Sequence, residues 1–121
     1  MTLSRDAFLK PVEAPREKVH IEALGGSVWV YGMTVRERSV FEKQFHNAKG
    51  QRTAKFPELR ERTIVQCVRN DDGSPMFTVD DIPALGNQFA CIIEPLFDAA
   101  NRLSGGGEAT EGNSEATETD S

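Results

Sequence analysis

The stretch VHIEALGGSVWVYG, residues 19–32, predicts a β-hairpin and with it the fold. Two runs of alternating apolar and polar residues flank Gly25 and Gly26. A Gly-Gly pair suits a two-residue turn that needs positive φ angles. Such a turn also sets the pairing of the strands, and it places Ala23 opposite Val28.

This register gives the hairpin two different faces. The apolar face, which we expect to join the core, holds Val19, Ile21, Ala23, Val28 and Val30. The opposite face is amphipathic, and exposed aromatic side chains are favoured anchors for protein partners. Four residues of that face are therefore our candidate partner-binding set: His20, Glu22, Trp29 and Tyr31.

Three helices are predicted after the hairpin. Thr34 and Glu37 form a capping box, so a helix should begin there and run to Gly50. Its apolar stripe consists of Phe41, Phe45 and Ala48. Pro57 suits the first turn of a second helix, which we expect to reach about Arg69.

The last predicted helix has the clearest periodicity. Its apolar residues recur at spacings of three and four: Phe89, Ile92, Ile93, Leu96, Phe97, Ala100 and Leu103. Pro95 should kink this helix, because proline removes one backbone hydrogen bond. We also expect Gly105 to end it in the left-handed conformation.

These elements predict one α+β domain over residues 1–103. In it, an N-terminal antiparallel β-hairpin packs on a small bundle of three to four α-helices. Phe8 and Leu9 are expected to dock on this body. Residues 104–121 lack large apolar side chains and read as a disordered acidic tail rich in Gly, Ser, Thr and Glu.

The net charge of −5 lies in the tail. The tail has no Lys or Arg and holds five acidic residues: Glu108, Glu111, Glu115, Glu118 and Asp120. Since the chain has 19 acidic and 14 basic residues in total, the part before Ser104 is neutral. A neutral body argues against a nucleic-acid-binding protein, which usually has a basic surplus.

The cysteines and the hydropathy indicate a cytoplasmic protein. Cys67 and Cys91 both lie in apolar helical patterns, so we expect two buried, reduced thiols, although a disulfide between the two helices is geometrically possible. We expect no signal peptide and no membrane span, because no apolar run has the length that either requires.

The stretch DDGSPMFTVDDIPALG, residues 71–86, raises the question of a metal or acid–base site. An EF-hand loop counted back from Gly73 would begin at Val68, which offers no oxygen ligand. The aspartates read instead as turn formers and as helix-start residues after the cap Thr78. An acid cluster of Asp71, Asp72, Asp80 and Asp81 remains the enzymatic alternative, although no His or nucleophile stands at a recognisable spacing.

Other catalytic patterns are missing from the sequence. It has no P-loop, no G-x-G-x-x-G, no H-E-x-x-H and no C-x-x-C. We therefore predict a non-enzymatic protein with no cofactor and no metal site.

Three motifs resemble one protein family. They are GGSVWVYGMT-x-x-E, DDGSPMFT-x-DD-x-x-ALG and LFDAANRLSG, and the resemblance spans about residues 3–105. The chain resembles the tail assembly chaperones of long-tailed, siphovirus-type bacteriophages. Pro83 and Pro95 depart from the expected pattern and put the straightness of their helices in doubt.

The resemblance implies a binding protein. Its expected partners are the tape-measure protein and the tail-tube protein, its place the host bacterial cytoplasm, and it would be absent from the mature virion. The family often has a second, frameshifted product, which here would share residues 1 to about 106. A small structural tail or neck protein of the virion is the alternative, and the position of the gene directly upstream of a tape-measure gene would distinguish the two.

Overall fold

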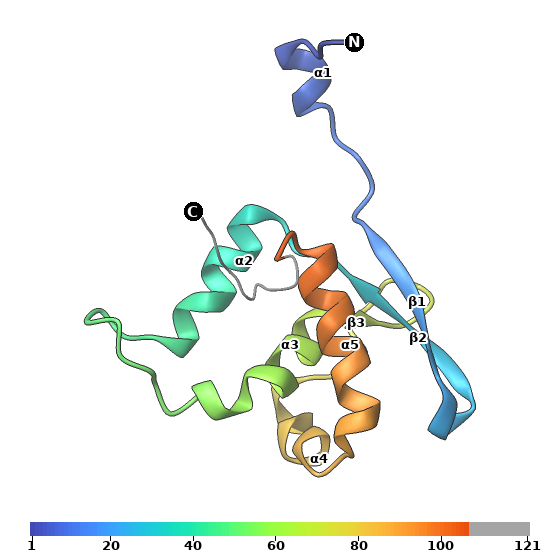
Figure 1. Ribbon diagram of the computed structural model, residues 1–121, viewed down its shortest axis with the longest axis vertical. Coiled ribbons are helices and arrows are strands. Elements are labelled where there is room, and N and C mark those ends of the chain that lie inside the picture. Colours follow the sequence, from blue (N-terminus) through green and yellow to red (C-terminus); the bar gives the residue numbers. More distant parts are fainter. Residues whose placement is uncertain (107–121) are drawn as a thin grey trace.

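The computed structural model describes residues 1–106 and confirms the α+β class. A β-hairpin lies along one side of a group of helices, and the N-terminus projects away from both (Figure 1). The strands are β1 (Arg16–Ile21), β2 (Gly26–Tyr31) and β3 (Val68–Arg69). The helices are α1 (Arg5–Leu9), α2 (Val35–Glu42), α3 (Leu59–Cys67), α4 (Ile82–Gly86) and α5 (Ala90–Leu103).

The sheet has three antiparallel strands in the order β1-β2-β3. The third strand corrects the prediction that the second helix reaches Arg69. The helix ends at Cys67, and Val68 turns into an extended conformation and pairs with Val30. Both valines are fully buried, so pairing satisfies their backbone while their β-branched side chains join the core.

The hairpin register differs from the predicted one. A four-residue turn replaces the two-residue turn: residues 22–24 form a short 3-10 helix, and Gly25 closes it with a φ of 69°. Val28 consequently pairs with Val19, and Ala23 lies exposed in the turn instead of in the core. The apolar face is otherwise as predicted.

The core lies between the inner face of the sheet, α3 and α5. It contains Val19, Ile21, Val30, Ile64, Cys67, Val68, Ile92, Ile93, Leu96, Ala99 and Ala100. The periodicity of α5 is confirmed for its buried face, and the helix continues through Pro95. Phe89, however, is the N-cap residue and is 74% exposed, so it is not part of that face.

The first long helix is shorter than predicted. Its capping box is present as expected, but α2 ends at Glu42 and a 3-10 turn, Lys43–Phe45, follows. The Asn47 side chain accepts hydrogen bonds from the backbone N–H groups of Lys49 and Gln51, which favours a turn over further helix. Ala48 is therefore exposed, whereas Phe41 and Phe45 are buried as predicted.

The N-terminal arm, residues 1–15, does not dock on the body as predicted. Figure 1 shows α1 standing clear of the sheet and helices on an extended linker. Phe8 is 74% exposed and Leu9 is 58% exposed. Pro11 and Pro15 keep the linker extended, which separates the apolar side chains of α1 from the core.

The described chain ends against the body. Gly105 has the predicted left-handed conformation, with a φ of 83°. The Met33 N–H donates to the Ser104 hydroxyl, and the Gly106 N–H donates to the carbonyl of Asn101. The predicted disorder concerns residues that, from 107 onward, lie outside the described part.

Candidate partner-binding surfaces

Trp29 and Tyr31 lie on the outer face of the hairpin, as predicted, and both are half-buried. Arginine and lysine side chains cover them. The guanidinium of Arg16 lies 4.4 Å from the centroid of the Trp29 ring and donates to the Tyr31 hydroxyl. Arg69 lies 5.0 Å from the Tyr31 centroid. The aromatics therefore face solvent through a cationic layer.

His20 and Glu22 lie at the tip of the hairpin. His20 is opposite Ser27 and bonds to its hydroxyl at 3.3 Å, and its Nε2 lies 3.2 Å from a Glu22 carboxylate oxygen. With Cys91 and Pro95 they line a groove of about 440 Å³ between the hairpin tip and α5. The four candidate residues therefore occupy two positions on the hairpin, and their role as a binding set stays a prediction.

The acidic stretch that follows β3 supports the hairpin. Asp71 accepts a hydrogen bond from the Trp29 indole N–H at 3.0 Å, a contact between residues 42 positions apart. Asp72 accepts hydrogen bonds from the hydroxyl and the backbone N–H of Ser74, which lower the pKa of its carboxyl. These two aspartates act as a brace and as a turn former.

The second pair of aspartates begins a helix. Thr78 and Asp81 form a reciprocal capping box, and Asp80 lies in the same first turn. This confirms the expected cap. Within residues 1–106, no three His, Cys, Asp or Glu side chains come together in a way that could hold a metal ion.

The two thiols differ in environment. Cys67 is buried as predicted, and burial raises the pKa of its thiol to about 11. Cys91 is exposed, which corrects the expectation of two buried thiols. It lies one residue before the buried face of α5 that begins with Ile92, so its apolar context in the sequence was misleading.

An apolar groove of about 330 Å³ opens between the hairpin, α4 and α5. Its lining includes Leu24, Val28, Met76, Phe77, Leu85 and Ile92. The volume is within the range of ligand pockets. Its one charged lining residue, Asp81, is engaged in the capping box, so the groove suits apolar groups.

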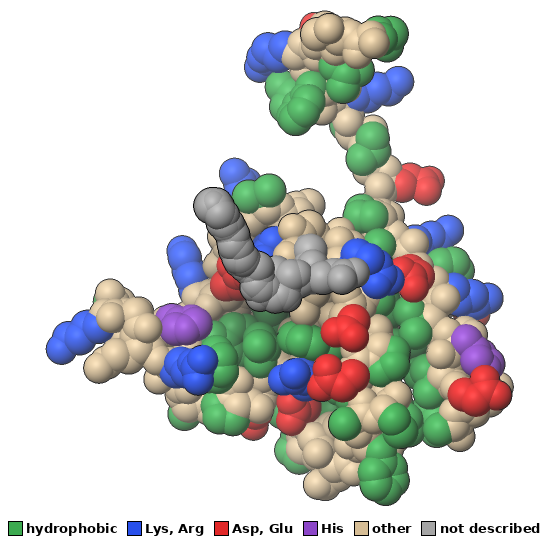
Figure 2. Space-filling model, in the orientation of Figure 1, with side chains coloured by type: hydrophobic (Ala, Val, Ile, Leu, Met, Phe, Trp, Pro, Cys, Tyr) green, Lys and Arg blue, Asp and Glu red, His purple; other side chains and the backbone are tan. Residues whose placement is uncertain are grey.

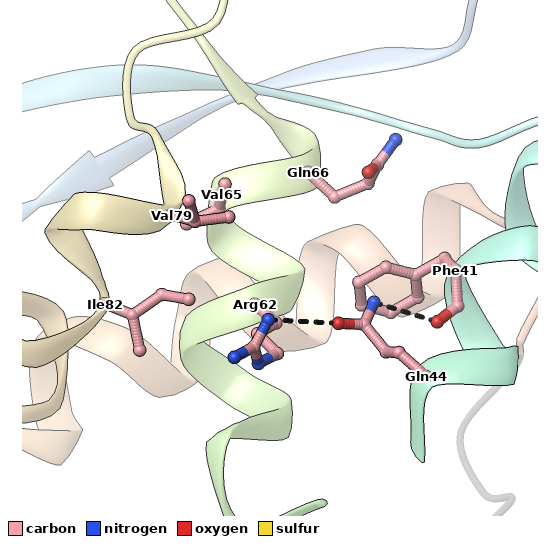
Figure 3. A pocket seen from close by; sticks show the side chains of 7 residues that line it. All are labelled: Phe41, Gln44, Arg62, Val65, Gln66, Val79 and Ile82. Atoms are coloured by element: carbon pink, nitrogen blue, oxygen red, sulfur yellow. Dashed lines mark hydrogen bonds between the residues drawn. The ribbon is translucent and has the colours of Figure 1, made fainter. Parts of the chain in front are cut away.

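A much smaller cavity of about 80 Å³ lies between α2 and α3 (Figure 3). The Arg62 guanidinium points across it to the Gln44 side chain, at 3.2 Å, and Gln44 in turn donates to the Phe41 carbonyl. Because the volume is far below that of ligand pockets and these polar groups are already bonded, the cavity reads as structural.

The largest gathering of exposed apolar side chains is on the N-terminal arm. It consists of Met1, Leu3, Phe8, Leu9 and Val12. The arm is visible as a separate lobe with green apolar side chains in Figure 2. Sequence periodicity could not reveal this exposure, because a five-residue helix shows no second apolar turn.

None of the helices within residues 1–106 combines the length and the apolar character that crossing a membrane requires.

Comparisons with known proteins return one similar structure. No protein-family model matches the chain, and no curated protein sequence gives a significant match. The chain is similar to a solved structure described as that of the bacteriophage HK97 tail assembly chaperone, at 15% identity and a TM-score of 0.48, with 78% of this chain and 89% of that chain covered. That description names the same kind of protein as the sequence resemblance, and at this identity the likeness assigns no role to any residue of this chain.

Proposed function

We propose that this chain is a non-enzymatic tail assembly chaperone that binds a tape-measure protein and helps recruit tail-tube subunits. The three motifs of the sequence resemblance support the proposal by their placement. Asp71 of the second motif bonds to Trp29 of the first, and Ser104 of the third bonds to Met33. The motifs thus build one structural unit and carry no reactive centre that the described residues reveal.

The observation that carries the proposal is the apolar arm. An isolated helix as short as α1 is marginal in water, since helices below about 12–15 residues rarely persist alone. The Ser4 side chain caps α1, yet Phe8 and Leu9 have no core to enter. Exposed apolar side chains of this kind mark an interaction site, and a long helical client offers apolar stripes that complement them.

Co-expression with the tape-measure protein tests the proposal. We expect the client to be soluble and to co-purify with this chain, and Phe8→Ser with Leu9→Ser to reduce the co-purified client at least about tenfold, the loss of 1.4 kcal/mol or more. Arg5→Ser with Lys10→Ser is the matched control in the same arm and should bind as the wild type does. Neither pair should lower the thermal midpoint.

The hairpin face is tested in the same assay. Trp29→Ala removes the ring that Arg16 and Asp71 contact. If the folded variant binds the client as the wild type does, the hairpin aromatics are not part of the binding site.

Two further observations separate this role from that of a structural virion protein. A chaperone should be detected in the host cytoplasm and be absent from purified virions, as measured by mass spectrometry. Its gene should directly precede a very long tape-measure gene. Stoichiometric amounts in the virion would contradict the proposal.

A further inference from the structure

The segment between α2 and α3, residues 43–55, carries charge of one sign. We call it the connector. It contains no Asp or Glu, and it exposes four basic side chains: Lys43, Lys49, Arg52 and Lys55. Lys and Arg side chains gather on the side of the molecule to which the connector projects (Figure 2).

The acidic residues around the connector are already engaged. Glu42 pairs with Arg38 at 3.1 Å, and Glu58 pairs with Arg62 at 2.8 Å. Among residues 1–106, no carboxylate forms an ion pair with the four connector cations. The Arg52 guanidinium stacks on Phe56 at 4.0 Å, an arrangement that leaves its N–H edge available to a carboxylate.

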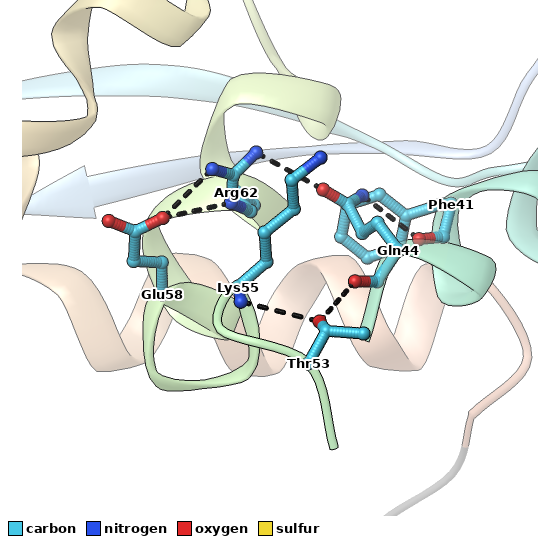
Figure 4. Close-up of polar contacts among 6 residues, drawn as sticks. All are labelled: Phe41, Gln44, Thr53, Lys55, Glu58 and Arg62. Carbon is cyan, nitrogen blue, oxygen red and sulfur yellow. Dashed lines mark hydrogen bonds and ion pairs between the residues drawn. The ribbon is translucent and has the colours of Figure 1, made fainter. Parts of the chain in front are cut away.

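The connector is held in place at both ends. The Thr53 hydroxyl donates to the Gln44 carbonyl at 2.5 Å and accepts from the Lys55 backbone N–H (Figure 4). The Thr53 N–H donates to the Phe45 carbonyl. Figure 4 draws no bond from the Lys55 ammonium group. The loop therefore presents its cations from an ordered base, which reduces the entropy lost when an anion binds.

The complementary charge is in the same chain. Residues 107–121 hold five carboxylates and no basic side chain. They follow Gly106, where an added Cβ would lie 3.5 Å from a guanidinium nitrogen of Arg38 in α2. The five residues from Arg38 to the connector span about 8 Å of helix. Fifteen residues reach about 50 Å when extended and about 20 Å as a flexible coil.

We propose that the connector is a docking surface for acidic peptide segments and that residues 108–120 of the same chain occupy it. Each exposed charge pair contributes little. Because the segment is tethered, however, its effective concentration is in the millimolar range, so several weak pairs suffice for occupancy. An acidic region of a client would have to displace this segment. The inference concerns the isolated chain and does not depend on the identity of the client.

Carbodiimide cross-linking of the full chain, followed by mass spectrometry, tests the contact. We expect amide links from Glu108, Glu111, Glu115 and Glu118 to the connector lysines. Lys10 and Lys18 are exposed comparison lysines on other elements. At about 20 mM salt the connector links should exceed theirs at least about fivefold, and at 0.5 M salt they should fall at least about threefold, because screening shortens the reach of exposed charges. Equal yields at all lysines, or yields indifferent to salt, would overturn the proposal.

Backbone amide spectra of full-length variants give a second measurement. Replacing the four glutamates by Gln and Asp120 by Asn should shift the amide signals of residues 43–55. Glu13→Gln with Glu22→Gln, two exposed carboxylates elsewhere, should leave those signals in place. If the connector signals ignore the acidic segment and respond only to a single-stranded DNA oligonucleotide, the surface binds nucleic acid and the proposal is wrong.

Discussion

Gly32 is the position at which a single methyl group should do the most damage. It follows β2 where the chain passes the end of α5. A Cβ there would lie 2.3 Å from the carbonyl oxygen of Leu103, 2.8 Å from its carbonyl carbon and 3.0 Å from Cγ of Pro15. Since two of these atoms belong to the backbone, no rotamer change relieves the contact, and Gly32→Ala must push β2 and α5 apart.

Two hydrogen bonds depend on this close approach. The Gly32 N–H donates to the Pro15 carbonyl at 2.8 Å, and the Met33 N–H donates to the Ser104 hydroxyl at 2.9 Å. Overpacking usually costs about 1–3 kcal/mol. Because the clash is with the backbone, we expect a loss of about 3 kcal/mol, which lowers the thermal midpoint of a domain of this size by about 10–20 °C.

Gly26→Ala is the matched control. Gly26 begins the same strand, has no atom within 4 Å of an added Cβ, and does not have a positive φ. We expect its free energy of unfolding to change by less than about 1 kcal/mol. Calorimetry and urea unfolding of both variants measure the difference. A Gly32→Ala chain as stable as Gly26→Ala would refute the close approach of β2 to α5.

Three other outcomes follow from the structure. In the native protein at pH 8, a thiol reagent should label Cys91 rapidly and Cys67 only after unfolding, because burial raises the pKa of Cys67 to about 11; equal labelling rates would contradict this. In a carboxyl-detected NMR titration, Ser74→Ala should return the pKa of Asp72 toward that of an ordinary aspartate. Since the folded-state pKa is the lower one, this contribution to stability is present above the ordinary aspartate pKa and is lost as the pH falls through the lowered value. Deleting residues 107–121 should leave the thermal midpoint within a few degrees of the wild type, and a larger loss would show that they pack on the body.

Local signals in the sequence identified where several helices begin. The capping boxes at Thr34 and Thr78 and the proline at position 57 all act within one helical turn, so neighbouring residues suffice to predict them. The end of the second helix depends on a distant partner. Val68 leaves the helix because Val30, 38 positions earlier, offers a strand to pair with. A helical pattern and a short strand pattern look alike over so few apolar residues.

The candidate site shows the same division between local and distant contacts. Alternation placed Trp29 and Tyr31 on the outer face correctly, because it needs only the period of a strand. It could not identify Arg16, Arg69 and Asp71 as the residues that contact the two aromatics. Asp71 lies 42 positions from Trp29, and its side chain reads equally well as part of a polar turn.

The hairpin also shows why a wrong turn left the two faces right. The predicted pairing placed Ala23 opposite Val28, whereas the structure places Val19 there, four residues earlier. An even shift keeps every side chain on its face, so the apolar pattern constrains only whether the shift is odd or even. The turn length settles the rest, and it changes the chemistry of the outer face. Lys18 now lies opposite Trp29, where the predicted register placed Glu22. A partner that reaches these aromatics therefore meets cations first, which favours an acidic or hydrogen-bond-accepting surface over a basic one.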